Sequence, residues 1–161
     1  MKKYKIDELY NNPNTIYVFD VDGVLAPLEF GEYNHYELDD DEWAKALLEK
    51  DLYAEKRPAK TFQKFLATKN KNNVYVATKV MNEMEKKQKI DFLNRNYGIF
   101  EDHVFEVYKN EDKLEVLKNL KKVYPLLEDK YFVMIDDTVD VLNHIMFNSS
   151  FSTVHVSSFI E

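Results

Sequence analysis

The chain alternates short apolar runs with longer stretches in which apolar residues recur every three or four positions. Three short runs, at 15–19, 73–77 and 131–135, are rich in β-branched and aromatic residues. Each of these runs is followed by a polar residue, and these residues are Asp20, Thr78 and Asp136. We therefore predict three buried strands that each end beside a chemically useful side chain.

Weaker patterns predict two further strands, at 103–108 and 153–157. Between the strands, apolar residues follow the period of helices that bury one face. The predicted helices span 40–56, 58–69, 82–96, 112–123 and 138–147. Gly98 and Pro125 lie just past two of them, where these residue types commonly end helices. Strands that alternate with helices of this length predict an α/β fold with a mostly parallel sheet.

Composition places the chain among globular proteins. A length of 161 residues suits a single domain over 1–161, and 45% hydrophobic residues are enough for a packed core. The net charge of -7 disfavours nucleic acid as a partner. The absence of cysteine excludes disulfides and cysteine nucleophiles. No apolar stretch has the length of a membrane span, so we expect a cytoplasmic protein.

Acidic residues gather where the strands are predicted to end. In an open α/β sheet, ligands bind outside the carboxyl ends of the strands. Asp20 and Asp22 follow the first strand, and Gly23 allows a sharp turn there. Asp136 and Asp137 follow another strand. Converging carboxylates repel one another, and Mg²⁺, which prefers carboxylate, water and phosphate oxygens, would relieve that repulsion.

These residue types suit phosphoryl chemistry. A carboxylate such as Asp20 can attack phosphorus to form an aspartyl-phosphate, while Asp22 protonates the leaving oxygen and later activates water. Thr78 supplies a hydroxyl and Lys113 a cation for the phosphoryl oxygens. Lys79, next to Thr78, is a further candidate for substrate binding. The sequence therefore predicts a Mg²⁺-dependent phosphatase with Asp20, Asp22, Thr78 and Lys113 as catalytic residues.

The order of these residues resembles the haloacid dehalogenase superfamily. The resembling segments are 16–25 for the first motif, 74–78 for the second, Lys113 within 110–117 for the third and 132–137 for the fourth. The likeness covers residues 15 to about 145. For the third motif, Lys109 is the alternative to Lys113, which we favour because it begins a predicted amphipathic helix. The resemblance implies a Rossmann-like three-layer sandwich and a phosphoric monoester hydrolase.

The resemblance also implies a metal site. Its ligands would be the Asp20 carboxylate, the Asp22 backbone carbonyl and Asp136, with Asp137 in support through water. The segment 26–57 lies where this family inserts a flap and a small cap, and its length leaves room for only a flap and one helix. Such an open site suits a small phosphorylated substrate, with nucleotides among the candidates. Flap residues that could stack on a base or sugar are Tyr33, His35 and Tyr36.

Other readings of the same residues remain open. A phosphotransferase would use the same aspartyl-phosphate, and a non-catalytic phosphate-binding or regulatory module would share the fold. A receiver domain is disfavoured because receivers place their acidic pair early and their Thr and Lys late, the reverse of the order here. Too few glycines are present for a kinase phosphate loop.

Several conspicuous polar residues have simpler explanations. The acidic run 39–41 precedes a predicted helix, so we interpret it as a helix cap and not as a second metal site. His103, His144 and His155 have no spacing typical of a metal cluster. We expect these histidines to be structural or to lie on the surface.

Overall fold

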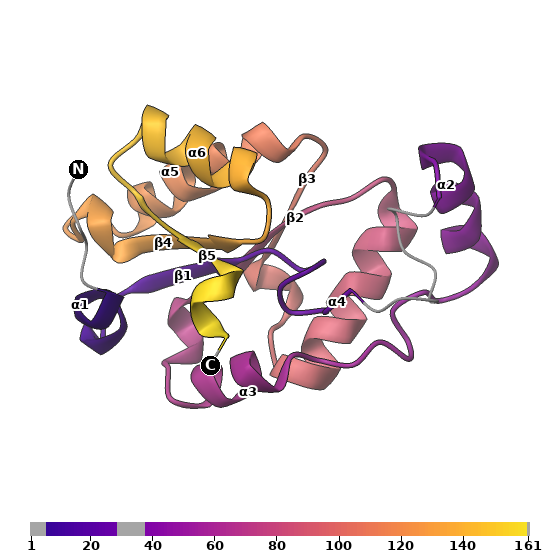
Figure 1. Cartoon of the computed structure of the whole chain (residues 1–161), viewed down its shortest axis with the longest axis horizontal. Coiled ribbons are helices and arrows are strands. Elements are labelled where there is room, and N and C mark those ends of the chain that lie inside the picture. The colour runs from indigo at the N-terminus through magenta and orange to yellow at the C-terminus, as the bar shows by residue number, and fades with distance from the viewer. Residues whose placement is uncertain (1–5, 29–37, 161) are drawn as a thin grey trace.

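The computed structural model describes residues 6–28 and 38–160. Its five strands form one sheet in the order β3-β2-β1-β4-β5, and all neighbouring strands are parallel (Figure 1). The strands are β1 (Ile16–Phe19), β2 (Val74–Lys79), β3 (Val104–Val107), β4 (Phe132–Asp136) and β5 (Ser152–His155). The α-helices are α1 (Ile6–Asn11), α2 (Asp40–Glu49), α3 (Lys60–Ala67), α4 (Glu83–Tyr97), α5 (Lys113–Val123) and α6 (Val139–Asn148). The 3₁₀ turns are Lys71–Asn73, Glu101–His103, Asn110–Asp112, Asp129–Tyr131 and Val156–Phe159.

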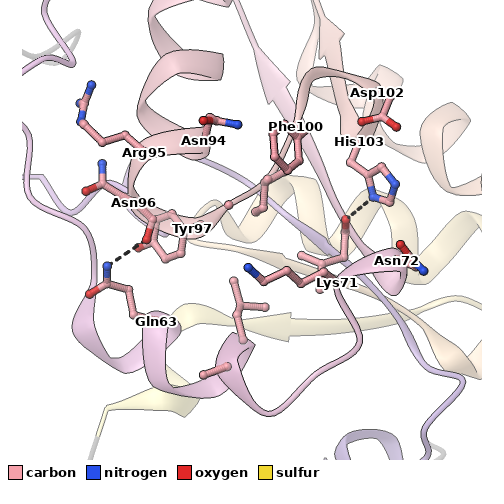
Figure 2. A pocket seen from close by; sticks show the side chains of 15 residues that line it. Gln63, Lys71, Asn72, Asn94, Arg95, Asn96, Tyr97, Phe100, Asp102 and His103 are labelled. Carbon is pink, nitrogen blue, oxygen red and sulfur yellow. Dashed lines mark hydrogen bonds between the residues drawn. The ribbon is translucent and has the colours of Figure 1, made fainter.

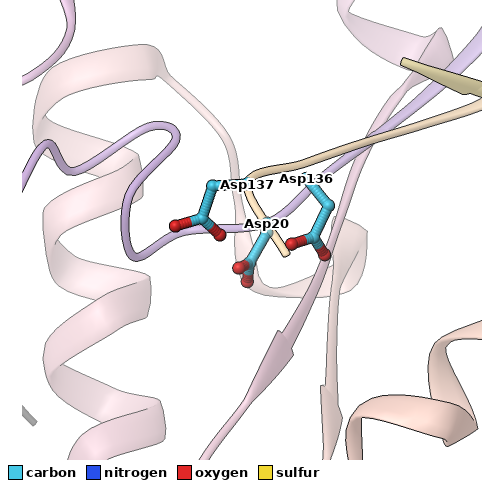
Figure 3. A group of neighbouring side chains, drawn as sticks. All are labelled: Asp20, Asp136 and Asp137. Carbon is cyan, nitrogen blue, oxygen red and sulfur yellow. The ribbon is translucent and has the colours of Figure 1, made fainter. Parts of the chain in front are cut away.

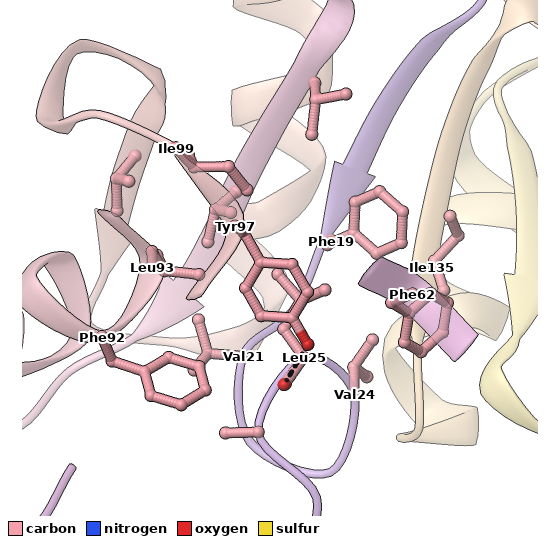
Figure 4. Close-up of a cluster of buried hydrophobic side chains, with 14 of the residues drawn as sticks. Phe19, Val21, Val24, Leu25, Phe62, Phe92, Leu93, Tyr97, Ile99 and Ile135 are labelled. Carbon is pink, nitrogen blue, oxygen red and sulfur yellow. Dashed lines mark hydrogen bonds between the residues drawn. The ribbon is translucent and has the colours of Figure 1, made fainter. Parts of the chain in front are cut away.

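Helices cover both faces of the sheet, which gives three layers (Figure 1). Alternate strand residues point to opposite faces, so one core contains Val18 and Met134 with apolar residues of α5 and α6. The other core contains Phe19 and Ile135 with residues of α2, α3 and α4, including Phe92 (Figure 4). The predicted Rossmann-like α/β fold is confirmed, and the sheet is entirely parallel. No helix among the described residues is both long and apolar enough to cross a membrane.

The predicted helix over 40–56 is wrong in its second half, because α2 ends at Glu49. The backbone amides of the next residues donate to side-chain oxygens and not to helical carbonyls. The amide of Leu52 donates to Gln88 Oε1 at 2.9 Å, and the amide of Tyr53 donates to Asp51 Oδ1 at 2.9 Å. Leu52 and Tyr53 are both buried, so contact with α4 replaces a further helical turn. The short helix α1 was not predicted.

The turn after β1 sets up the edge of the sheet at which β1 and β4 end. The amide of Ala26 donates to the Val21 carbonyl at 2.8 Å, and the amide of Gly23 donates to the Ala26 carbonyl at 2.9 Å. Gly23 has a φ of 75°, which residues with a Cβ rarely adopt. The strand order reverses between β1 and β4, and ligands of open α/β sheets bind at such a switch point.

Replacing Gly23 with alanine should disturb this turn twice over. The left-handed φ costs about 1–2 kcal/mol for an alanine. A Cβ at this position would also lie 2.1 Å from Asp137 Oδ2, so the Asp137 carboxylate would have to move. We expect Gly23→Ala to lower the free energy of unfolding, measured by urea denaturation.

Gly98→Ala is the matched control, because Gly98 has a φ of 65° and, among the described residues, its added Cβ would meet only the far end of the flexible Lys71 side chain, at 2.8 Å from Nζ. Gly98→Ala should therefore show the backbone cost alone. Gly23→Ala should lose at least about 1 kcal/mol more, as overpacking does. Equal losses in the two variants would contradict the close approach of Gly23 to Asp137.

Candidate functional site

Three carboxylates meet at the carboxyl ends of β1 and β4. The two strands are adjacent, and the Asp20 amide donates to the Ile135 carbonyl at 3.0 Å, which fixes Asp20 beside the end of β4. One carboxylate oxygen from each of Asp20, Asp136 and Asp137 lies within 4.8 Å of the others (Figure 3). Asp136 is fully buried, and its Oδ1 accepts from the Thr138 amide at 2.9 Å. The side chains are therefore gathered by the sheet itself.

Lys113 lies against two of these carboxylates. Its Nζ is 2.8 Å from Asp136 Oδ2 and 3.3 Å from Asp20 Oδ1. Burial alone would lower the pKa of Lys113, but the Asp20 and Asp136 charges outweigh that effect and raise it, so the side chain stays cationic. The side chain of Lys109, the alternative third-motif residue, is exposed. The geometry favours Lys113.

The Asp22 carboxylate lies apart from these three. Its Oδ1 accepts from the Tyr53 hydroxyl at 2.7 Å, and its Oδ2 is 2.9 Å from Lys89 Nζ. The side chain thus turns toward Lys89 of α4 and toward Tyr53 in the segment between α2 and α3. Any contribution of Asp22 to the three-carboxylate cluster would come from its backbone carbonyl, as the resemblance implies.

Thr78 and Lys79 lie at the end of β2, next to the same edge. Thr78 is buried, and its Oγ1 accepts a hydrogen bond from Lys89 Nζ at 2.9 Å. Among the described residues, its own hydroxyl proton has only a long contact of 3.5 Å, to the Lys79 carbonyl. That proton is therefore available for a stronger acceptor. The Lys79 side chain is exposed, and both residues line the cavity that contains Asp20.

Sequence reasoning missed four residues of this neighbourhood. They are Trp43, Tyr53, Glu85 and Lys89. Lys89 is 1% exposed and is 3.3 Å from Glu85 Oε1, which also accepts from the Trp43 indole at 3.2 Å. A signal for two of them was present: Glu85 and Lys89 continue the helical stripe of Phe92 and Leu93. Charged residues in a buried stripe indicate buried ion pairs.

Two cavities lined by the described residues differ in size and in the chemistry of their walls. One, of about 310 Å³, is lined by Asp20, Asp22, Thr78 and Lys79 among others. A larger cavity of about 570 Å³ lies at the other end of β2, around the end of α4 (Figure 2). There His103 Nδ1 bonds to the Val74 carbonyl at 2.8 Å, which is a structural role. The smaller cavity is lined by Asp20 and Asp22, whose carboxylates contact the buried ammonium groups of Lys113 and Lys89, so we take it as the candidate site.

The site suits a divalent cation. Its carboxylates outnumber its ammonium groups; the carboxylates are Asp20, Asp22, Glu85, Asp136 and Asp137, and the ammonium groups are the buried Lys89 and Lys113 and the exposed Lys79. Burial is the main cause that raises the pKa of Asp20 to about 6, and it also raises the pKa of Asp137. Oxygen ligands in such an acidic setting match the preference of Mg²⁺. Asp20, Asp136 and Asp137 could hold the ion.

The remaining polar candidates have structural roles where they are described. Asp39 caps α2: its Oδ1 accepts from the Glu42 amide at 2.8 Å, and Glu42 Oε2 accepts from the Asp39 amide at 3.0 Å. This capping box confirms the interpretation of the run 39–41. His155 Nε2 lies 3.1 Å from the Asp137 carbonyl, and His144 is exposed. Tyr33, His35 and Tyr36 lie outside the described residues.

No protein-family model and no curated protein sequence matches this chain. The likeness to the haloacid dehalogenase superfamily therefore depends on the motif residues themselves.

Mg²⁺ should stabilise the protein against unfolding if the three carboxylates bind it. At a concentration about 100 times its Kd, a ligand that binds only the folded state adds about 2.7 kcal/mol. We expect a Mg²⁺-dependent rise in the melting temperature. Asp137→Asn should require about 10- to 100-fold more Mg²⁺ for the same rise. Asp41→Asn, an exposed change in the first turn of α2, is the control and should respond like the natural chain. Equal responses of all three proteins would exclude this metal site.

Mg²⁺ affinity should also depend on pH. Asp20 must be deprotonated to bind the ion, and in the metal-free protein its pKa is about 6. Affinity should therefore be fully present well above pH 6 and fall as the pH drops through this value. Calorimetry should show about tenfold weaker binding at about pH 5 than at about pH 7.5. Equal affinity at the two pH values would contradict the buried environment of Asp20.

Proposed function

We propose that this chain is a Mg²⁺-dependent phosphatase of the haloacid dehalogenase type, which hydrolyses a small phosphorylated metabolite through an aspartyl-phosphate. One observation carries the proposal: the Lys113 ammonium lies 3.3 Å from Asp20 Oδ1 and 2.8 Å from Asp136 Oδ2, with Asp137 alongside. A cation that contacts a carboxylate at a strand end can also neutralise a phosphoryl group brought to that carboxylate.

In the first step, a carboxylate oxygen of Asp20 attacks phosphorus. The bond between phosphorus and the leaving oxygen breaks, and that oxygen takes a proton from Asp22. In the second step, a water oxygen attacks the phosphorus and gives its proton to Asp22. The bond from phosphorus to Asp20 breaks, which restores the Asp20 carboxylate and releases phosphate. The second proton transfer leaves Asp22 ready for the next substrate.

The phosphoryl oxygens need donors throughout these steps. Lys113 contacts two carboxylate oxygens among the described residues, so one of its three N–H groups can serve the phosphoryl group. Thr78 can redirect its hydroxyl proton, and Lys79 extends into the same cavity. Mg²⁺ bound by Asp20, Asp136 and Asp137 would supply electrostatic stabilisation of the phosphoryl oxygens.

The cavity supports a small substrate. A volume of about 310 Å³ suits a phosphorylated metabolite, nucleotides included. We place this activity in the cytoplasm. The phosphoryl group of the same intermediate could pass from Asp20 to the oxygen of an alcohol in place of water. Product analysis separates hydrolase from phosphotransferase, since only the hydrolase releases inorganic phosphate in the absence of an alcohol.

Asp20→Asn should abolish turnover of an aryl phosphate, because an amide is a poor nucleophile toward phosphorus. Asp22→Asn should slow turnover of an alkyl phosphate by about 10²–10⁴-fold, since that leaving group needs a proton. Phosphate release with Mg²⁺ measures both variants.

Asp41→Asn serves as the control here as well and should retain the natural rate. Activity that survives Asp20→Asn would reject Asp20 as nucleophile. A near-natural rate in Asp22→Asn would reject the acid/base role.

A further inference from the structure

Both oxygens of the Asp22 carboxylate are held by residues from outside the strand edge. The Tyr53 hydroxyl donates to Oδ1 at 2.7 Å, and the Lys89 ammonium donates to Oδ2, with 2.9 Å between the atoms. Tyr53 is 0% exposed and Lys89 is 1% exposed. Tyr53 comes from the segment between α2 and α3, and Lys89 comes from the middle of α4. Two separate parts of the chain thus fix one side chain.

Lys89 has no donor left for a substrate. An ammonium group has three N–H bonds. Lys89 Nζ lies 2.9 Å from Asp22 Oδ2, 2.9 Å from Thr78 Oγ1 and 2.7 Å from the Lys79 carbonyl, with Glu85 Oε1 at 3.3 Å as a further acceptor. This saturation contrasts with Lys113, for which the described residues supply two acceptors. Lys113 can therefore bind phosphate, whereas Lys89 can only orient its neighbours.

Tyr53 is itself held rigidly. Its amide donates to Asp51 Oδ1 at 2.9 Å, and its carbonyl accepts from the Arg95 guanidinium at 3.1 Å. Its ring packs on Phe92, with ring centres 6.3 Å apart. A phenol fixed at both the backbone and the ring presents its hydroxyl in one direction, toward Asp22. The position of this hydroxyl therefore depends on how Tyr53 packs against Phe92 and Arg95 of α4.

We propose that Tyr53 and Lys89 are positioning residues that hold Asp22 as an oriented carboxylate for hydrolysis of the aspartyl-phosphate. The inference rests on the proposed function. Contacts on both oxygens fix the direction in which the Asp22 carboxyl group faces the attacking water, whose proton it accepts. The water oxygen bonds to phosphorus, its proton passes to Asp22, and the electron pair of the broken bond returns to Asp20. The segment between α2 and α3 thereby contributes to the second step through Tyr53.

Tyr53→Phe tests this role, because it removes one hydroxyl and keeps the shape of the side chain. With a nitrophenyl phosphate the first step needs no proton donor, so only the second step should slow. We expect kcat to fall about 10- to 100-fold. Rapid mixing should show a burst of nitrophenol equal to the enzyme concentration, as the aspartyl-phosphate accumulates.

Tyr75→Phe is the matched control. Tyr75 is also buried, and its hydroxyl lies 2.6 Å from that of Tyr124, near the opposite end of β2. This variant should keep kcat within about twofold and show no burst, since the Tyr75 hydroxyl contacts Tyr124 and shares no partner with Asp22 among the described residues. A similar fall in both tyrosine variants would attribute the effect to stability and overturn the inference.

A double-mutant cycle shows whether Tyr53 acts through Asp22. In an Asp22→Asn background, Tyr53→Phe should change the rate by less than about twofold. Lys89→Met should behave in the same way. Its control is Lys86→Met on the same helix, α4, which removes an ammonium group 2.7 Å from Glu106 Oε2 of β3. Full additivity in the cycle, or a Tyr53→Phe variant with the natural rate and no burst, would overturn the inference.

A second measurement separates this inference from the proposed function. The carbon resonance of the Asp22 carboxyl group, observed by NMR in the resting protein, requires no turnover. Tyr53→Phe should shift this resonance, and Tyr75→Phe should leave it in place. If the natural chain hydrolyses no phosphate monoester, the proposed function fails while the resonance still decides the positioning of Asp22. An Asp22 resonance that is identical in both variants would overturn the inference.

Discussion

Repulsion among carboxylates at the carboxyl ends of β1 and β4 is the constraint on which this site depends. Two like charges about 4 Å apart at an effective dielectric constant of about 20 repel by about 4 kcal/mol. The fold offsets this repulsion with Lys113 beside Asp20 and Asp136, and with Lys89 between Asp22 and Glu85. Negative charge still predominates at this edge, and such a setting of carboxylate oxygens is what a divalent cation prefers.

Much of this edge could be predicted from local sequence. Buried strands that end at Asp20 and Asp136 reveal themselves by apolar runs, and parallel strands bring their ends together. Lys113 could be predicted from its place at a helix start. Tyr53 and Lys89 could not be assigned to the site, because they contact Asp22 from far along the chain. Tyr53 lies more than thirty positions after Asp22, and Lys89 lies more than sixty positions after it. Such contacts depend on how α4 packs, which periodicity alone does not give.

The residues that follow α2 show how tertiary contacts override a local pattern. A helical period continues to residue 56, yet α2 ends at Glu49 because Leu52 and Tyr53 bury themselves against α4. The same contacts carry the Tyr53 hydroxyl to Asp22. The early end of α2 and the contact between Tyr53 and Asp22 therefore have one cause. The segment between α2 and α3 is thereby connected directly to Asp22.

A crystal structure grown with Mg²⁺ and trifluoroberyllate, which mimics a phosphoryl group on a carboxylate, tests the carboxylate edge most directly. The structure should contain the ion among Asp20, Asp136 and Asp137, beryllium bonded to an Asp20 oxygen, and Lys113 in contact with fluorine. An ion bound elsewhere, with Asp20 free of beryllium at saturating concentrations, would contradict the assignment of Asp20 as the nucleophile of a metal-assisted phosphatase.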